Sequence, residues 1–264
     1  MRSPGRADWF VPIMGGLIGL CWIALVLWEQ SPYGRYLDHD RWTEIGFAAR
    51  ICRALPAGNT LLPALLYAVG WLLMVAAMML PTTLPLLRRF NALVAQHSSP
   101  GVLVALLIAG YLLVWSGFGL AAHLLDLAVH AAVQRTPWLI GHGWLIGSGV
   151  LAAAGAFQFT KLKYRCLDRC RTPLGFIIQH WHGLAPRREA FRLGLHHGIF
   201  CVGCCWALML LIFVVGTGNV GWMLVLGAIM AIEKNAAWGR RLGRPLGMVL
   251  MGWAALILAA NLMA

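Results

Sequence analysis

Long apolar segments constrain what this chain can fold into more than any other feature of its sequence. The chain has 264 residues, of which 60% are hydrophobic and 11% are charged, whereas a soluble domain carries about 25% charged residues. A helix of about 20 apolar residues crosses a bilayer. Seven segments meet or approach this length, at 9–28, 60–80, 102–125, 140–159, 193–215, 219–232 and 245–263. The sequence therefore predicts one all-α integral membrane domain over 1–264, a polytopic bundle of about seven transmembrane helices.

The basic residues predict the orientation of this bundle. With the N-terminus inside, the inner segments hold 16 Lys and Arg residues and the outer loops hold 5. Cytoplasmic loops are enriched in Lys and Arg, so we expect an N-in, C-out protein of the bacterial inner (plasma) membrane, with the lipid bilayer as its surroundings. The net charge of +12 follows from this pattern, and nucleic acid is not an expected partner.

The predicted span 193–215 contains a histidine pair and three cysteines in a stretch of ten residues. The segment reads His196-His197-Gly-Ile-Phe-Cys201-Val-Gly-Cys204-Cys205. At about 100° per residue, His197, Cys201 and Cys204 fall within roughly 60° of arc, with Cys205 and Met209 beside them. One helix face thus offers imidazole, thiol and thioether groups, which are ligands for soft metal ions. The alternative, that the cysteines pack as small hydrophobic residues, stays open.

Methionines gather where the predicted span 60–80 ends. Met74 and Met78 are four residues apart and share a helix face, Met79 follows, and Pro81 is expected to stop or kink the helix. In the N-in orientation these methionines lie at the same level as the cysteines of 193–215. They are either core-filling residues or thioether ligands for Cu(I).

Two further cysteines, Cys166 and Cys170, follow the predicted span 140–159 in a basic segment. The spacing of four puts both sulfurs on one side of a helix, and neighbouring cations favour thiolates. The segment is either a place of metal capture or redox exchange, or a basic interfacial helix with incidental cysteines. Glu233 and Lys234 close the span 219–232 at the same level, and either reach the headgroups or support the site.

A separate group, His123, Asp126 and His130, recurs at helical spacing near the predicted outer face. It is either a polar helix end at the interface or an outer metal or proton site. An outer site together with an inner site would be compatible with transport.

Several motifs together resemble those of the DUF2182 family, described as predicted metal-binding integral membrane proteins. The likeness covers roughly residues 70–250, and its most specific block ends in Gly203-Cys204-Cys205-Trp206. The other matching pieces are Trp71-x-x-Met74-x-x-Ala77-Met78-Met79-Leu80-Pro81, Gly110-Tyr111-x-x-x-Trp115, Lys163-x-x-Cys166-Leu167-x-x-Cys170-Arg171-x-Pro173, His180-Trp181-x-Gly183, Gly194-x-x-His197-Gly198-x-x-Cys201 and Glu233-Lys234. The resemblance implies a membrane protein that binds a metal.

Our leading hypothesis is a membrane protein that holds a soft transition metal near the cytoplasmic face, for transfer or transport. Copper is favoured over zinc because thioethers accompany the thiols. The expected ligands are His197, Cys201, Cys204 and Cys205, with Met78, Met79 and Met209 as thioether partners and with Cys166 and Cys170 to pick up or hand over the ion. A metal-donor protein or a membrane complex is the expected partner.

Two other classes of function remain open from the sequence. One is a membrane redox enzyme that uses a bound metal, or a haem ligated by a histidine. The other is a structural or assembly subunit of a larger membrane complex. Neither a substrate pocket nor a nucleotide-binding motif is recognisable in the sequence, so it does not decide whether the protein is an enzyme.

Overall fold

The computed structural model describes residues 9–30, 61–215 and 219–263, and every regular element within these ranges is a helix. This confirms the predicted all-α class. The elements are α1 (Phe10–Glu29), α3 (Leu61–Leu93), α4 (Pro100–Arg135), α5 (Pro137–Gly141), α6 (Trp144–Phe157), α7 (Lys161–Arg171), α8 (Pro173–His180), α9 (Pro186–Val215), α10 (Val220–Asn235), the short 3₁₀ helix η2 (Gly239–Leu242) and α11 (Gly243–Leu262).

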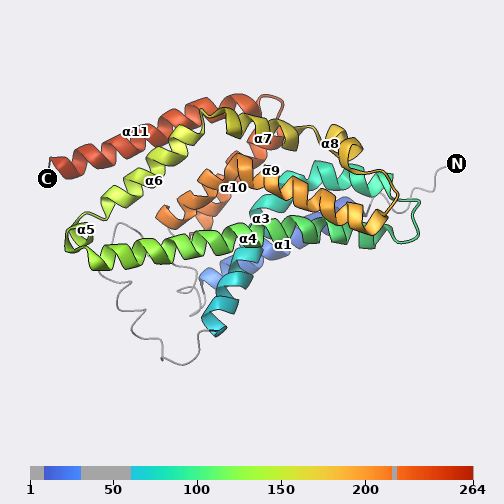
Figure 1. Ribbon diagram of the computed structural model, residues 1–264, viewed down its shortest axis with the longest axis horizontal. Coiled ribbons are helices and arrows are strands. Elements are labelled where there is room, and N and C mark those ends of the chain that lie inside the picture. Colours follow the sequence, from blue (N-terminus) through green and yellow to red (C-terminus); the bar gives the residue numbers. More distant parts are fainter. Residues whose placement is uncertain (1–8, 31–60, 216–218, 264) are drawn as a thin grey trace.

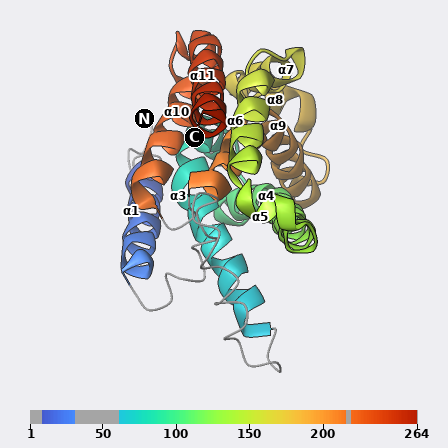
Figure 2. The ribbon, with the colours of Figure 1, turned by 90° about the vertical axis from the view of Figure 1, so that its left-hand side faces the viewer.

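The helices form an elongated bundle along which α4 runs from end to end (Figure 1). Helix α9 packs on α4, α1 on α3, and α6 on α11, while the short α7 lies across α9. Figure 2 shows α1 and α3 on one side of α10, and α6 with α11 on another. The core is therefore made where α3, α4, α7, α9 and α10 meet, and most of the predicted site residues come from these helices.

Five of these helices are long and apolar enough to cross a membrane: α1, α3 from Tyr67, α4, α9 to Ile212, and η2 with α11. The pair α6 and α7 adds a sixth if it counts as one span bent by 64°. The predicted span 219–232 corresponds to α10, which has only 16 residues and is shorter than the usual minimum of about 17. The membrane class is supported, whereas seven spans and the N-in orientation stay predictions.

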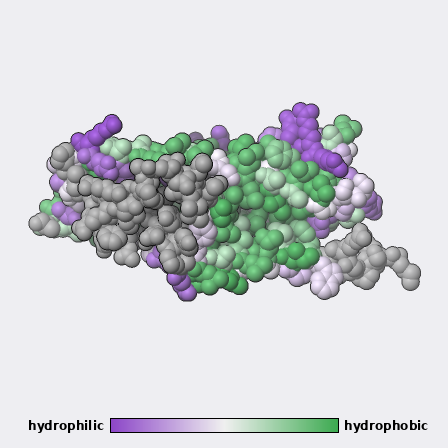
Figure 3. Space-filling view, turned by 90° about the horizontal axis from the view of Figure 1, so that it is seen from below, coloured by the Kyte–Doolittle hydropathy of each residue, from purple (hydrophilic) through white to green (hydrophobic). Residues whose placement is uncertain are grey.

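The outer surface agrees with lipid surroundings. Large apolar side chains such as Leu20, Ile23 and Leu256 are more than half exposed. In Figure 3 the middle of the visible face is hydrophobic, and hydrophilic groups lie towards its ends. An apolar surface of this extent is costly in water and is the expected surface of a membrane helix.

Helix α3 does not stop at Pro81. It continues through Pro81 and Pro85 to Leu93, so Pro81 does not stop the helix; the other expectation, a kink, stays a prediction. Helix α3 is packed among other helices, and prolines are tolerated inside membrane helices in such surroundings. The hydroxyls of Thr82 and Thr83 make additional hydrogen bonds to the carbonyls of Met79 and Leu80, at 2.7 and 2.9 Å. The continuation matters because it brings Thr82 into the core.

Glycines allow α4 and α9 to touch backbone to backbone. A methyl group on Gly194 would lie 2.0 Å from the carbonyl oxygen of Leu107, and one on Gly110 would lie 2.3 Å from that of Phe191. Small residues permit this close approach in membrane bundles. The contact fixes the height of α9 against α4, and so places the cysteines of α9 beside Tyr111.

We predict that Gly194→Ala lowers the melting temperature of the detergent-purified protein, whereas Gly117→Ala does not. The added methyl at 194 meets a backbone atom that cannot rotate away, and overpacking of this kind costs about 1–3 kcal/mol. Gly117, on the same α4 as Leu107, has open space around it, and alanine there improves helix propensity by up to about 1 kcal/mol. Equal melting temperatures for the two variants would contradict the close contact.

Candidate functional site

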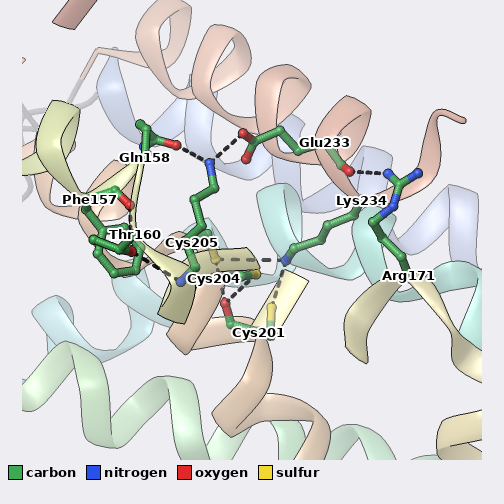
Figure 4. A network of polar contacts seen from close by, with 10 residues as sticks. Phe157, Gln158, Thr160, Arg171, Cys201, Cys204, Cys205, Glu233 and Lys234 are labelled. Carbon is green, nitrogen blue, oxygen red and sulfur yellow. Dashed lines mark hydrogen bonds and ion pairs between the residues drawn. The ribbon is translucent and has the colours of Figure 1, made fainter. Parts of the chain in front are cut away.

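The predicted metal-binding face of α9 lies in the interior of the bundle. Cys201, Cys204 and Cys205 are at most 2% exposed, and His197 is 3% exposed. The thiols of Cys204 and Cys205 both donate to the carbonyl of Cys201, at 3.1 and 2.8 Å. The six cysteines that the structure describes are all free thiols; Cys52 lies outside the described residues. Three sulfurs thus sit within one turn of a buried helix (Figure 4).

A lysine ammonium group projects into this sulfur cluster from α10. The Nζ atom of Lys234 lies 2.9 Å from Sγ of Cys201, 3.9 Å from Sγ of Cys205 and 3.3 Å from Oγ1 of Thr82. Lys234 is only 5% exposed. Oη of Tyr111, on α4, lies 3.0 Å from Sγ of Cys201. Three helices, α4, α9 and α10, therefore meet at one sulfur atom, and α3 reaches the same place through Lys234.

The buried ammonium sets the electrostatics of the cluster. An uncompensated charge in an apolar interior is very costly, and buried charges are accordingly paired. The groups that contact Nζ of Lys234 are two thiols and one hydroxyl. Of these, only the thiols ionise readily enough to supply a negative charge. An ion pair at this place therefore requires one of these two thiols as its anion.

Helix α7 brings its cysteines to the same place. The sulfur of Cys166 lies 2.7 Å from the position that a Cβ at Gly203 would take, so the missing side chain of Gly203 makes room for it. The Cys170 side chain interacts with the thiol of Cys204. Cysteines separated by more than thirty residues in sequence are thus brought together from two helices.

A second buried pair holds α7 in position. Nζ of Lys163 lies 2.5 Å from a carboxylate oxygen of Glu233, and it also donates to the side chain of Gln158. All three side chains are at most 2% exposed. Arg171, at the other end of α7, donates to the backbone carbonyls of Glu233 and Ala237. Both ends of α7 are therefore tied to the C-terminal turn of α10 (Figure 4).

His197 lies one helical turn before Cys201 and is enclosed by aromatic rings. Its ring centroid is 5.8 Å from that of Tyr111 and 5.6 Å from that of Phe176. Its Nδ1 atom is buried and has no hydrogen-bond partner among the described residues. An imidazole nitrogen left without a partner at this place is available to a ligand.

The predicted thioethers are buried around the cluster but are not all part of it. Met78 packs against Gly227 of α10, one turn along α3 from Thr82 and so one turn from Lys234. Met79 and Met209 are both fully buried, and Met209 follows Cys205 by one turn of α9. Met78 thus lies one turn from Thr82, which contacts Lys234, and the ligand roles of Met78, Met79 and Met209 stay predictions.

The candidate outer group lies elsewhere. Nδ1 of His130 is 3.5 Å from a carboxylate oxygen of the buried Asp126, and the His123 ring stacks on Tyr67. Asp126 follows Tyr111 by fifteen residues along α4, which is about 22 Å at 1.5 Å per residue. This group and the sulfur cluster are therefore separate features.

The donor set suits a soft ion, but a metal-binding geometry is not formed in this arrangement. Within the described ranges, no three His, Cys, Asp or Glu side chains are placed so that they could hold one metal ion. Instead, the ammonium group of Lys234 is the cation that contacts the sulfurs. An incoming metal ion would take over these contacts, and the orphaned Nδ1 of His197 and the thiol of Cys204 are within a turn of them.

A comparison with protein families identifies the chain. A family model named PpoB2 and described as a copper chaperone matches residues 68–257. The chain belongs to the PpoB2 copper chaperone family. No curated protein and no solved structure matches the chain. The match supports copper as the metal among those considered and includes the sulfur cluster, Lys234 and both cysteines of α7; the narrower DUF2182 resemblance stays a prediction.

Sequence reasoning missed several residues around the sulfur cluster. It left open whether Glu233 and Lys234 reach the headgroups or support the site, and it did not predict that they turn to different partners in the core, Lys163 and Cys201. Tyr111 stood in a family motif without a role, and neither the Lys163 ammonium nor Gln158 was considered. A usable signal was the lysine at the end of a very apolar helix, because ionisable residues in membrane segments are commonly functional and paired.

We predict that mild oxidation with diamide forms a disulfide between Cys170 and Cys204. The two thiols already interact, and a disulfide needs Cα atoms within about 7 Å. The measurement is mass spectrometry of digested protein that retains only these two cysteines. A matched variant that retains Cys21 of α1 and Cys204 serves as the control, and equal cross-linking of both variants would show that α7 does not rest on α9 as described.

Proposed function

We propose that this member of the PpoB2 family is a membrane-embedded carrier of monovalent copper, held by the thiolates of α9. The observation that carries the proposal is the buried sulfur cluster of Cys201, Cys204 and Cys205 with a cation already against it. Thiolates and thioethers are the ligands that favour Cu(I). The description of the family as copper chaperones supports the same ion.

The charge of Lys234 favours a monovalent cargo. Two thiolates, one monovalent ion and the Lys234 ammonium together carry no net charge. With a divalent ion the same groups would carry a net positive charge inside an apolar bundle, where uncompensated charge is costly. At 4 Å, and with an effective dielectric constant of 20, two unit charges interact with about 4 kcal/mol, and this repulsion doubles for a divalent ion. Zinc is therefore the less suitable cargo.

The cysteines of α7 provide a second pair of ligands for transfer. Because the side chain of Cys170 interacts with Cys204 and that of Cys166 lies on Gly203, an ion on α9 can gain a sulfur of α7 before it loses one of α9. Such stepwise exchange never leaves the ion without ligands. We infer that α7 delivers the ion to, or receives it from, a partner protein at the membrane surface.

We expect the detergent-purified protein, loaded under reducing conditions, to hold about one copper per chain, and Cys201/Cys204/Cys205→Ser to hold almost none. Loss of the thiolates removes the soft ligands while serine keeps the size and polarity of the side chains. Metal content is measured by mass spectrometry of the element. Cys21→Ser, a change at another buried thiol, should leave the copper content unchanged. Equal copper in all three proteins would refute the proposed site.

We further expect Lys234→Leu to shift the site towards divalent ions. Leucine removes the charge and adds no metal ligand, so the ratio of the Cu(I) to the Zn²⁺ association constant should fall at least about tenfold, equivalent to about 1.4 kcal/mol. Competition with chelators of known affinity measures both constants. Lys234→Arg, which keeps the charge, should retain the wild-type preference. An unchanged ratio in Lys234→Leu would show that Lys234 does not select the ion.

A further inference from the structure

Two histidines from different helices face each other near the start of α9. The ring centroids of His180, the last residue of α8, and His196 of α9 are 4.7 Å apart, with 56° between the ring planes. Both side chains are partly exposed, unlike the buried groups of the sulfur cluster. The pair therefore combines two imidazoles with access from outside the bundle.

The hydrogen bonds of the two rings leave nitrogen lone pairs available. Nδ1 of His180 lies 2.9 Å from the carbonyl oxygen of Phe176, and as a donor to that carbonyl it leaves Nε2 as an acceptor. Metal-binding histidines typically donate their other ring N–H to a backbone carbonyl in this way. Nδ1 of His196 is buried and finds no hydrogen-bond partner among the described residues. A buried nitrogen of this kind is costly unless a ligand engages it.

The separation of the rings suits a shared ion. A metal lies about 2 Å from an imidazole nitrogen, and so roughly 3.2 Å from the ring centroid. Two such rings with centroids 4.7 Å apart would meet at the ion with an angle close to 90–100°. This is the bent arrangement of neighbouring ligands in tetrahedral or square-planar coordination. The tilt of 56° between the planes also argues against simple face-to-face stacking.

The pair stands next to the buried site. His196 precedes His197 in the chain, and the ring of Phe176 lies 4.5 Å from that of His180 and 5.6 Å from that of His197. The α9 sulfurs are at most 2% exposed, so an ion must first bind elsewhere to reach them. A metal-binding pair at the surface, adjacent to His197, would provide such a first binding place.

We propose that His180 and His196 form a second metal site, which binds a copper ion or another late transition-metal ion through two imidazole nitrogens. The site holds the ion at the surface before it passes by His197 to the sulfur cluster. Arg192 is exposed one turn earlier on α9. Its positive charge weakens the binding of a metal ion at the pair, and weaker binding suits transit rather than storage. Only the passage rests on the proposed function; the binding at the pair does not.

The binding is tested with Cu²⁺ as the probe, in a variant in which the five cysteines of α7 and α9 are serine. We expect one Cu²⁺ per chain, whose electron paramagnetic resonance spectrum shows coupling to two nitrogens. His180→Gln and His196→Gln should each weaken the affinity by at least about tenfold. His182→Gln, two residues from His180 and exposed, is the matched control and should bind as before. No bound Cu²⁺, or equal loss in the control, would overturn the proposal.

A second measurement uses the chain with all its cysteines, in case the serine variant does not fold. Zn²⁺ added to protein already loaded with Cu(I) should protect His180 and His196, but not His182, from modification by diethylpyrocarbonate, as read by peptide mass spectrometry. Absence of selective protection would also overturn the site.

The passage has its own test. His180→Gln should leave the final Cu(I) content unchanged while slowing Cu(I) loading by at least about tenfold. Unchanged loading would refute the transit role. The proposed function is tested separately, by the copper content of the cysteine variants. Failure of the transit role and failure of the proposed function are therefore distinguishable.

Discussion

The burial of one positive charge organises the core of this protein. Lys234 is placed by the C-terminal turn of α10 among apolar helices, where a lone ammonium would be strongly unfavourable. Its contacts with Cys201, Cys205 and Thr82 resolve this cost only if sulfur carries negative charge. The metal-binding capacity and the stability of the core thus depend on the same pair. In the proposed carrier, an ion that takes over the sulfur contacts leaves the ammonium nearby, so two thiolates balance the charges of the ammonium and of one monovalent soft ion.

The neighbouring Glu233 extends this argument to α7. Adjacent residues on a helix point about 100° apart, so Glu233 and Lys234 turn to different partners, Lys163 of α7 and Cys201 of α9. Removing one member of a buried pair typically costs about 3–5 kcal/mol, because the other is left uncompensated. The two helices that carry the clustered cysteines, α7 and α9, are therefore both held by one turn of α10. Their sulfurs stay in register as long as that turn stays in place.

Sequence patterns located the helices and the cysteines well, because both depend on local periodicity. The apolar runs predicted both ends of α1 and α11, the start of α4 and the end of α9 to within two residues, but not the end of α4 or the start of α9. The helix arc placed Cys201, Cys204 and His197 on one face. The errors came from tertiary context. Helix α3 continues past Pro81 because it is packed among other helices, where proline is tolerated; the short α10 leaves the predicted seventh span open. Two pairs, Cys170 with Cys204 and His180 with His196, join residues that are not close in the chain. Such pairs have no local sequence signature.

The close contact of α4 with α9 explains how buried polar groups can coexist with exchange of an ion. Backbone contact at Gly110 and Gly194 fixes one side of α9, so Tyr111 and His197 have little freedom. On the opposite side α7 is short and is attached to α10 mainly through polar and ionic contacts at its two ends. The interface of α7 with α9 is also smaller than that of α4 with α9, so moving α7 would forfeit less packing than separating α4 from α9. Rearrangement during the proposed copper transfer should therefore involve α7 and the side chain of Lys234, while α4 and α9 keep their places.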